Sequence, residues 1–78
     1  MTFAQALDIL NRRSQIQDEA ADPRAGATLV LEAAHLVVTE VARVAKTDTS
    51  ELGDWIEGGS YTGNETPQSI AAEWDSNG

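Results

Sequence analysis

Apolar residues recur at helical spacing along most of the chain, and the first such stretch covers residues 2–21. Its apolar positions lie three and four residues apart, which is typical of an amphipathic helix. Thr2, followed three residues later by Gln5, forms the capping-box pattern that begins many helices. This helix is expected to end at or before Asp22, because Pro23 disfavours helical geometry in the residue before it.

Residues 27–46 carry the broadest apolar arc of the chain and are predicted to form the central helix. A strand over residues 28–31 is the competing interpretation, since valine and threonine favour strands. A stretch of about 20 residues without a turn signal is, however, much longer than a typical strand. The helix begins either directly after an Asp22 cap or near Ala27, because Gly26 weakens a first turn.

The apolar arc of this central helix is wider than a surface helix needs, so the helix should pack against more than one neighbour. A homodimer interface is a second use for the excess apolar surface. The residues proposed for that interface are Val30, Val37, Val38 and Val41.

Two short helices are predicted in the last third of the chain. The first covers about residues 48–57, before a pair of glycines, and the second begins at Pro67. Trp55 and Trp74 each end one of these helices, and they either plug the core or form a partner contact. The fold class is therefore predicted to be all-α. We expect a small helical bundle in which two longer helices form a hairpin and two short C-terminal helices close over it.

The length of 78 residues allows one domain, and a hydrophobic content of 41% is compatible with a folded core. The absence of cysteine excludes disulfides, thiolate metal sites and thiol catalysis. No run reaches the roughly 18 apolar residues that a membrane span needs, and the N-terminus lacks the basic segment of a signal peptide. The expected location is the cytoplasm.

No catalytic pattern is visible. His35 is the only histidine, and no nucleophile or acid stands near it in the sequence to form a catalytic pair. The carboxylates of residues 48–57 are spaced by three on a predicted helix, which spreads them instead of gathering them around a calcium ion. We therefore predict a protein that is not an enzyme and that uses no metal or cofactor.

The charge of the chain is strongly asymmetric. Residues 1–46 hold six acidic and all five basic side chains, whereas residues 47–78 hold seven acidic side chains and no basic one, for a net charge of −8. The acidic segment either serves solubility or forms a surface that repels nucleic acid and membranes and attracts a basic protein. Tyr61 lies in a glycine-rich loop and is expected to be exposed. The candidate partner-binding residues are Asp48, Glu51, Asp54, Glu57, Tyr61, Glu65, Glu73 and Asp75.

The short chain, the missing cysteines and the seven acidic residues of this segment resemble the small acidic proteins encoded by phages and mobile elements, among them the anti-CRISPR proteins. The closing residues 63–75 also look like the tails of phage-type proteins. The resemblance is one of class, so it assigns no functional residue.

The resemblance implies an inhibitor that mimics DNA and works by binding in the host cytoplasm. Its acidic surface would block the basic nucleic-acid channel of a host defence complex, without contacting nucleic acid or membrane itself. The alternative function is a structural or adaptor module that dimerises through its central helix.

Overall fold

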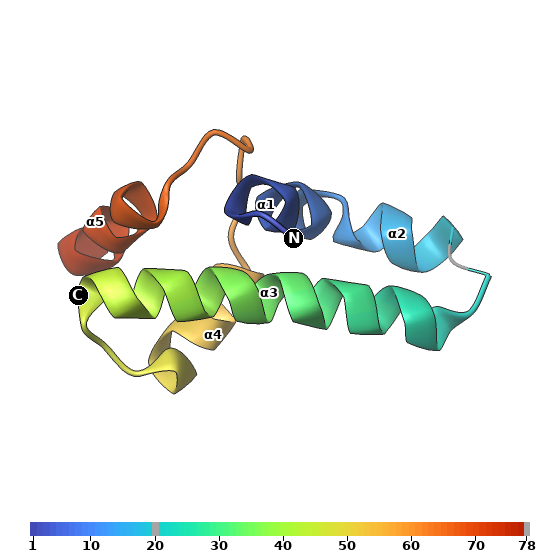
Figure 1. The fold of residues 1–78 in the computed structure, drawn as a ribbon, viewed down its shortest axis with the longest axis horizontal. Helices are drawn as coiled ribbons and strands as arrows, with labels where there is room; N and C mark the ends of the chain where they lie inside the picture. The colour runs from blue at the N-terminus through green and yellow to red at the C-terminus, as the bar shows by residue number, and fades with distance from the viewer. Residues whose placement is uncertain (20, 78) are drawn as a thin grey trace.

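The computed structural model of the chain describes residues 1–19 and 21–77, and in that part it has five α-helices and no strand. The all-α class is therefore confirmed. The longest helix, α3 (Pro23–Ala45), is the axis on which every other helix packs (Figure 1). Helices α1 (Phe3–Asn11) and α2 (Arg13–Glu19) follow one side of α3. Helix α4 (Thr49–Glu57) lies on the opposite side, and α5 (Pro67–Asn77) covers the C-terminal end of α3.

The prediction of one helix over residues 2–21 is corrected, because the chain breaks at Arg12 into α1 and α2. Arg12 leaves helical geometry, with φ −106° and ψ 20°, and its N–H is shared between the carbonyls of Asp8 and Ile9. The Arg13 side chain donates to the Leu10 carbonyl at 2.6 Å, near the break. Residue 20, near the end of the predicted helix, lies outside the described residues.

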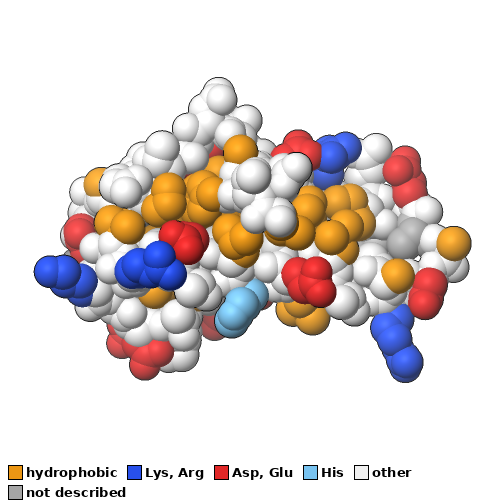
Figure 2. All heavy atoms as spheres, viewed as in Figure 1, with side chains coloured by type: hydrophobic (Ala, Val, Ile, Leu, Met, Phe, Trp, Pro, Cys, Tyr) orange, Lys and Arg blue, Asp and Glu red, His pale blue; other side chains and the backbone are white. Residues whose placement is uncertain are grey.

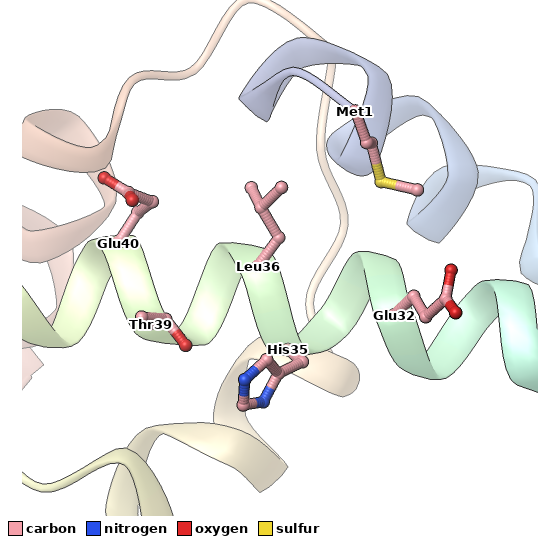
Figure 3. Close-up of a pocket in the computed structure, with 6 residues that line it drawn as sticks. All are labelled: Met1, Glu32, His35, Leu36, Thr39 and Glu40. Atoms are coloured by element: carbon pink, nitrogen blue, oxygen red, sulfur yellow. The ribbon is translucent and has the colours of Figure 1, made fainter.

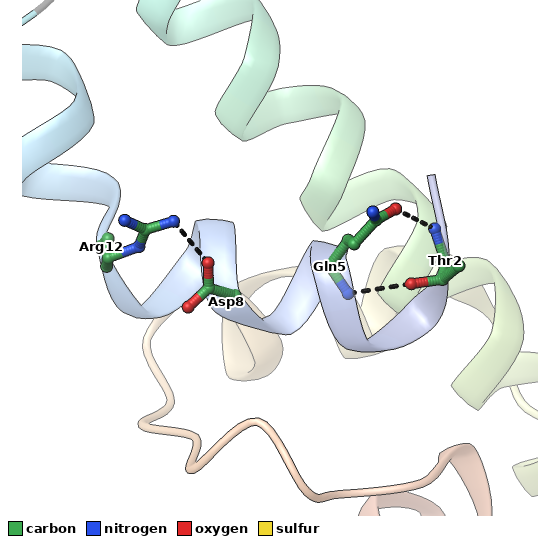
Figure 4. Close-up of polar contacts among 4 residues, drawn as sticks. All are labelled: Thr2, Gln5, Asp8 and Arg12. Atoms are coloured by element: carbon green, nitrogen blue, oxygen red, sulfur yellow. Dashed lines mark hydrogen bonds and ion pairs between the residues drawn. The ribbon is translucent and has the colours of Figure 1, made fainter.

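The capping box at the start of α1 is confirmed. The Gln5 N–H donates to the Thr2 hydroxyl at 3.1 Å, and the Thr2 N–H donates to the Gln5 side-chain oxygen at 2.8 Å (Figure 4). One turn further on, Asp8 and Arg12 form an ion pair across the solvent side of α1 (Figure 4). The capping box gives partners to backbone N–H groups at the helix N-terminus that have none within the helix.

Helix α3 begins at Pro23, so the earlier of the two predicted starts is the observed one. Asp22 caps the helix by accepting the Arg24 N–H at 3.0 Å. The helix continues through residues 28–31, which excludes the strand interpretation there. It ends at Lys46, which adopts a left-handed conformation with φ 56°.

The two short C-terminal helices are also found, as α4 and α5. Asp48 caps α4 by accepting the Ser50 N–H at 3.0 Å, and the helix ends before Gly58. Helix α5 begins at Pro67, where the Thr66 hydroxyl accepts the Ser69 N–H at 3.1 Å. Proline suits the first helical position, because a backbone N–H there would have no partner within the helix.

One hydrophobic core joins α1, α3, α4 and α5, because each of them turns its apolar side chains toward the same interior. The largest fully buried side chains come from all four helices. They are Leu7, Leu10, Val37, Val41, Leu52, Ile56 and Ile70.

The valines proposed for a homodimer lie in or against this core. Val37 and Val41 are fully buried, Val38 is nearly so, and Val30 is partly buried against the same cluster. Their apolar surface already holds the chain's own helices together. The homodimer stays a prediction, but other residues would have to form its interface.

Helix α3 also bears on the expectation that no segment is apolar enough to span a membrane. By length and composition alone α3 could cross one, since an 18-residue window within it reaches a mean hydropathy of 1.4. The central core helix of a soluble protein meets the same criterion, and 44% of that window is buried within the fold. The result is therefore weak evidence for a membrane role.

Candidate functional site

The carboxylates of α4 lie on its solvent side. Leu52 and Ile56 are fully buried against α3, so the three-residue spacing of the acids carries them around the opposite side of the helix. All four are exposed. They are Asp48, Glu51, Asp54 and Glu57. Asp48 also caps the helix, and Glu51 accepts a hydrogen bond from the Thr47 hydroxyl at 3.1 Å.

Helix α5 adds Glu73 and Asp75, which are both exposed. Trp55 and Trp74 join the two acidic helices, with ring centroids 5.4 Å apart in an edge-to-face arrangement of 60°. Both rings are half-buried against the core, which favours a packing role over a free contact surface. This ring contact connects the two acidic helices, each of which packs mainly on α3.

Among the described residues, no ion pair neutralises a carboxylate of these two acidic helices. In the part of the chain that the structure describes, the two ion pairs are Arg12–Asp8 and Arg43–Glu40. Both lie within residues 1–46, so the carboxylates of residues 47–77 have no such partner. Exposed carboxylates without cations keep their full negative potential toward solvent.

Glu65 differs from the other acids because it serves the loop between α4 and α5. Its carboxylate accepts the N–H groups of Thr62, at 2.8 and 3.0 Å to its two oxygens, and of Gly63, at 2.9 Å. Burial opposes ionisation, but these backbone hydrogen bonds outweigh it and lower the pKa of Glu65 below its usual value. Glu65 thus shapes the loop, and its oxygens face the backbone N–H groups of Thr62 and Gly63.

The expectation that Tyr61 is exposed is corrected. The ring is half-buried against the core, and its hydroxyl donates to the Ile56 carbonyl at 2.6 Å. Burial raises the pKa of Tyr61 to about 12, with Arg13 opposing and Glu65 and Glu73 reinforcing the shift. The Tyr61 side chain therefore anchors the glycine-rich loop, because its ring packs against the core and its hydroxyl is bound to the end of α4.

His35 lies at the rim of a surface hollow of about 370 Å³ on α3 (Figure 3). Leu36 projects from α3 on the same side as Met1, and the carboxylates Glu32 and Glu40 lie on either side of it along the helix. His35 is exposed. Within residues 1–19 and 21–77, no group of three or more His, Cys, Asp or Glu residues is arranged to hold a metal ion.

The face of the molecule that carries this hollow differs from the acidic helices. Figure 2 shows a band of hydrophobic side chains along the junction of α3 with the helices above it, with acidic and basic side chains interspersed. Basic residues belong only to the first part of the chain, so a mixed charge on this side agrees with the near-neutral residues 1–46.

Sequence reasoning missed the exposure of Leu31. This side chain is 62% exposed, more than Leu29 and Val44 on the same helix, which are 37% and 38% exposed. Two hollows of about 400 Å³ each meet at Leu31, and Glu57 lines both. The unusually wide apolar arc of residues 27–46 was the available signal for it.

Comparison with protein-family models, with curated proteins and with solved structures finds no match to this chain. The function is therefore inferred from the surface of the molecule itself.

Proposed function

We propose that this protein is a non-enzymatic inhibitor that binds a basic protein surface through the acidic face of α4 and α5. The acidic face consists of six exposed carboxylates, namely Asp48, Glu51, Asp54, Glu57, Glu73 and Asp75. The observation that carries the proposal is that no ion pair reaches any of these carboxylates among the described residues. The surface it would occupy is the nucleic-acid-binding site of a host complex of the CRISPR defence type.

The carboxylates of α4 form a row of negative charge that can stand in for part of a run of phosphates. Glu51, Asp54 and Glu57 follow one another at about 4.5 Å along the helix axis, and each is turned by about 60° from the one before. Duplex DNA carries one charge per ~1.7 Å of its axis, so α4 is a sparser row of charge than the duplex that it would replace. The remaining chain, with α1 and α2 against α3 as a hairpin-like and nearly neutral body, would act as the scaffold.

The source in this proposal is a phage or mobile element, and the place of action is the cytoplasm of its host. This agrees with the small size and the lack of cysteine. A protein that is already folded around one core can bind without an ordering cost, which suits an inhibitor that must act at once.

The test is capture of host proteins on the immobilised protein at low and high salt, followed by elution with duplex DNA and mass spectrometry. Binding through exposed charges should weaken strongly with salt, and DNA should release the partner. The variant Glu51→Lys/Asp54→Lys/Glu57→Lys should capture nothing. Capture that survives both high salt and this triple charge reversal would disprove the proposal.

A matched control reverses three charges elsewhere. Asp18→Lys/Glu19→Lys/Glu32→Lys changes the net charge equally, but at exposed positions on α2 and α3. It should bind as the wild type does. Circular dichroism should show both variants to be as helical as the parent, because all six positions are exposed.

The adaptor function remains a second candidate because α3 leaves Leu29, Leu31 and Val44 exposed. Exposed apolar side chains are a usual component of the interfaces of helical dimers. Light scattering distinguishes the two functions. An adaptor dimer predicts twice the monomer mass, independent of salt, whereas the inhibitor requires no self-association.

A further inference from the structure

The most exposed leucine of the molecule stands between two hollows. One lies between α3 and α4, where Leu31, Ala34 and Val38 form its floor. The other lies between α3 and the α1–α2 side, where Leu10 and Val30 line it together with Leu31. Leu31 and Glu57 line both, so the two hollows are neighbours, and we call them together the Leu31 groove.

The α3–α4 half of the groove is open because α4 has a glycine in its wall. Gly53 lines this hollow, and a Cβ atom placed on it would meet no atom within 4 Å. Leu31 and Val38 line the same hollow, so a larger residue at position 53 would take up part of its space. The open space is thus one that a side chain from another molecule can fill.

The charge around the groove identifies the kind of molecule. Glu57 borders both halves, and Asp54 lies one turn before it on the exposed side of α4. No Lys or Arg lines the α3–α4 half, while Arg13 lines the other. A second copy would bring its own Glu57 and a net charge of −8 against the same edge, so like charges oppose a self-association there.

We propose that the α3–α4 half of the Leu31 groove receives one bulky aliphatic or aromatic side chain of a basic protein partner. Lys or Arg residues on either side of that anchor would pair with Glu57 and Asp54. This inference rests on the proposed function, and it adds an apolar anchor to a surface that charge alone would make unselective. Apolar anchors seated in pockets provide most of the affinity of many interfaces, while surrounding charges set orientation and encounter rate.

The probes are two fluorescein-labelled helical peptides of equal length and charge. One contains only Lys and Ala, and the other carries a single Leu in place of a central Ala. Fluorescence anisotropy at low salt should show about tenfold tighter binding of the Leu peptide, the gain expected from burying one leucine side chain. Amide shifts of Gly53 and Leu31 in NMR spectra should move with the Leu peptide only.

The variant Gly53→Leu fills the hollow and should abolish the preference for the Leu peptide while leaving the affinity for the Lys–Ala peptide unchanged. Ala72→Leu is the matched control, because it adds a leucine at an exposed position of α5 away from the groove. It should keep the preference. Leu31→Ala is an independent variant should Gly53→Leu fail to fold, and it should reduce the same preference.

Equal binding of the two peptides by the wild type overturns this inference and leaves the proposed function standing, provided that reversal of Glu51, Asp54 and Glu57 abolishes both. Absence of binding to either peptide overturns both proposals. A wild-type dimer in light scattering that becomes monomeric in Leu31→Ala also overturns the inference, because it assigns the groove to a second copy.

Discussion

The side chain of Asn11 holds the backbone of Tyr61 at both of its hydrogen-bonding groups. The Asn11 amide nitrogen donates to the Tyr61 carbonyl, and the Tyr61 N–H donates to the Asn11 amide oxygen at 2.8 Å. The two residues are 50 positions apart, so the contact ties the C-terminal end of α1 to the loop between α4 and α5. The loop that joins the two acidic helices is therefore held in place by hydrogen bonds to α1.

Replacing Asn11 by Ala should lower the free energy of unfolding by about 1 kcal/mol, because two hydrogen bonds to the loop are lost and the freed backbone groups can turn to water. Urea denaturation followed by circular dichroism measures the change. Ser14→Ala, at an exposed position on α2, should alter the stability by less than about 0.5 kcal/mol. Equal stabilities of the two variants would contradict a structural role for Asn11.

The pKa of Tyr61, raised from 10.0 to about 12, predicts a loss of stability in alkali. Between these two values the unfolded chain releases the phenolic proton and the folded chain retains it. The free energy of unfolding should therefore fall as the pH rises from 10.0 toward about 12. Tyr61→Phe should show a smaller fall over that range. Because the chain has one tyrosine, tyrosinate absorbance reports its titration directly.

The lowered pKa of Glu65 predicts the opposite dependence in acid. Its ionised carboxylate stabilises the fold above the unfolded value near 4.5, and that contribution is lost as the pH falls through the lower folded pKa. Glu65→Gln should be less stable than the wild type at neutral pH, and the two should converge in acid. Urea midpoints of Glu65→Gln and the wild type, compared across pH, check this, and Glu73→Gln at an exposed position of α5 controls for the loss of one carboxylate charge.

Two glycines should respond in opposite ways to alanine. At Gly53 the added methyl group meets no atom within 4 Å, so Gly53→Ala should raise the free energy of unfolding by about 1 kcal/mol through better helix propensity. At Gly59 the new Cβ would lie 2.7 Å from the Tyr61 hydroxyl oxygen. Gly59→Ala should therefore destabilise the protein by about 1 kcal/mol or more. Thermal unfolding of the two variants compares them directly.

Local signals predicted most of the helices. The Thr2–Gln5 capping box, the Asp22 and Asp48 caps and the prolines that begin α3 and α5 each act over a few residues, so they can be recognised without a tertiary structure. The break at Arg12 could not be recognised in this way. No proline or glycine marks it, and residues 2–21 keep a helical pattern across it.

The candidate site, too, could be predicted from the sequence only in part. Exposure of the acids on α4 follows from their spacing opposite Leu52 and Ile56, which the sequence displays. Neither the hydrogen bonds of the Glu65 carboxylate to the loop backbone nor the half-buried ring of Tyr61 follows from a local pattern, because both depend on how a glycine-rich loop folds back on itself and on α1.

The amino-acid sequence by itself determined the helical class, the caps of the helices and the concentration of negative charge after Lys46, because periodicity, capping and composition are local properties. Only the tertiary structure decided which apolar side chains remain in solvent. Val37, Val38 and Val41 of α3 are buried in the shared core, whereas Leu31 on the same helix stays exposed beside a hollow that Gly53 also lines. That outcome depends on how distant helices pack, which no local pattern contains.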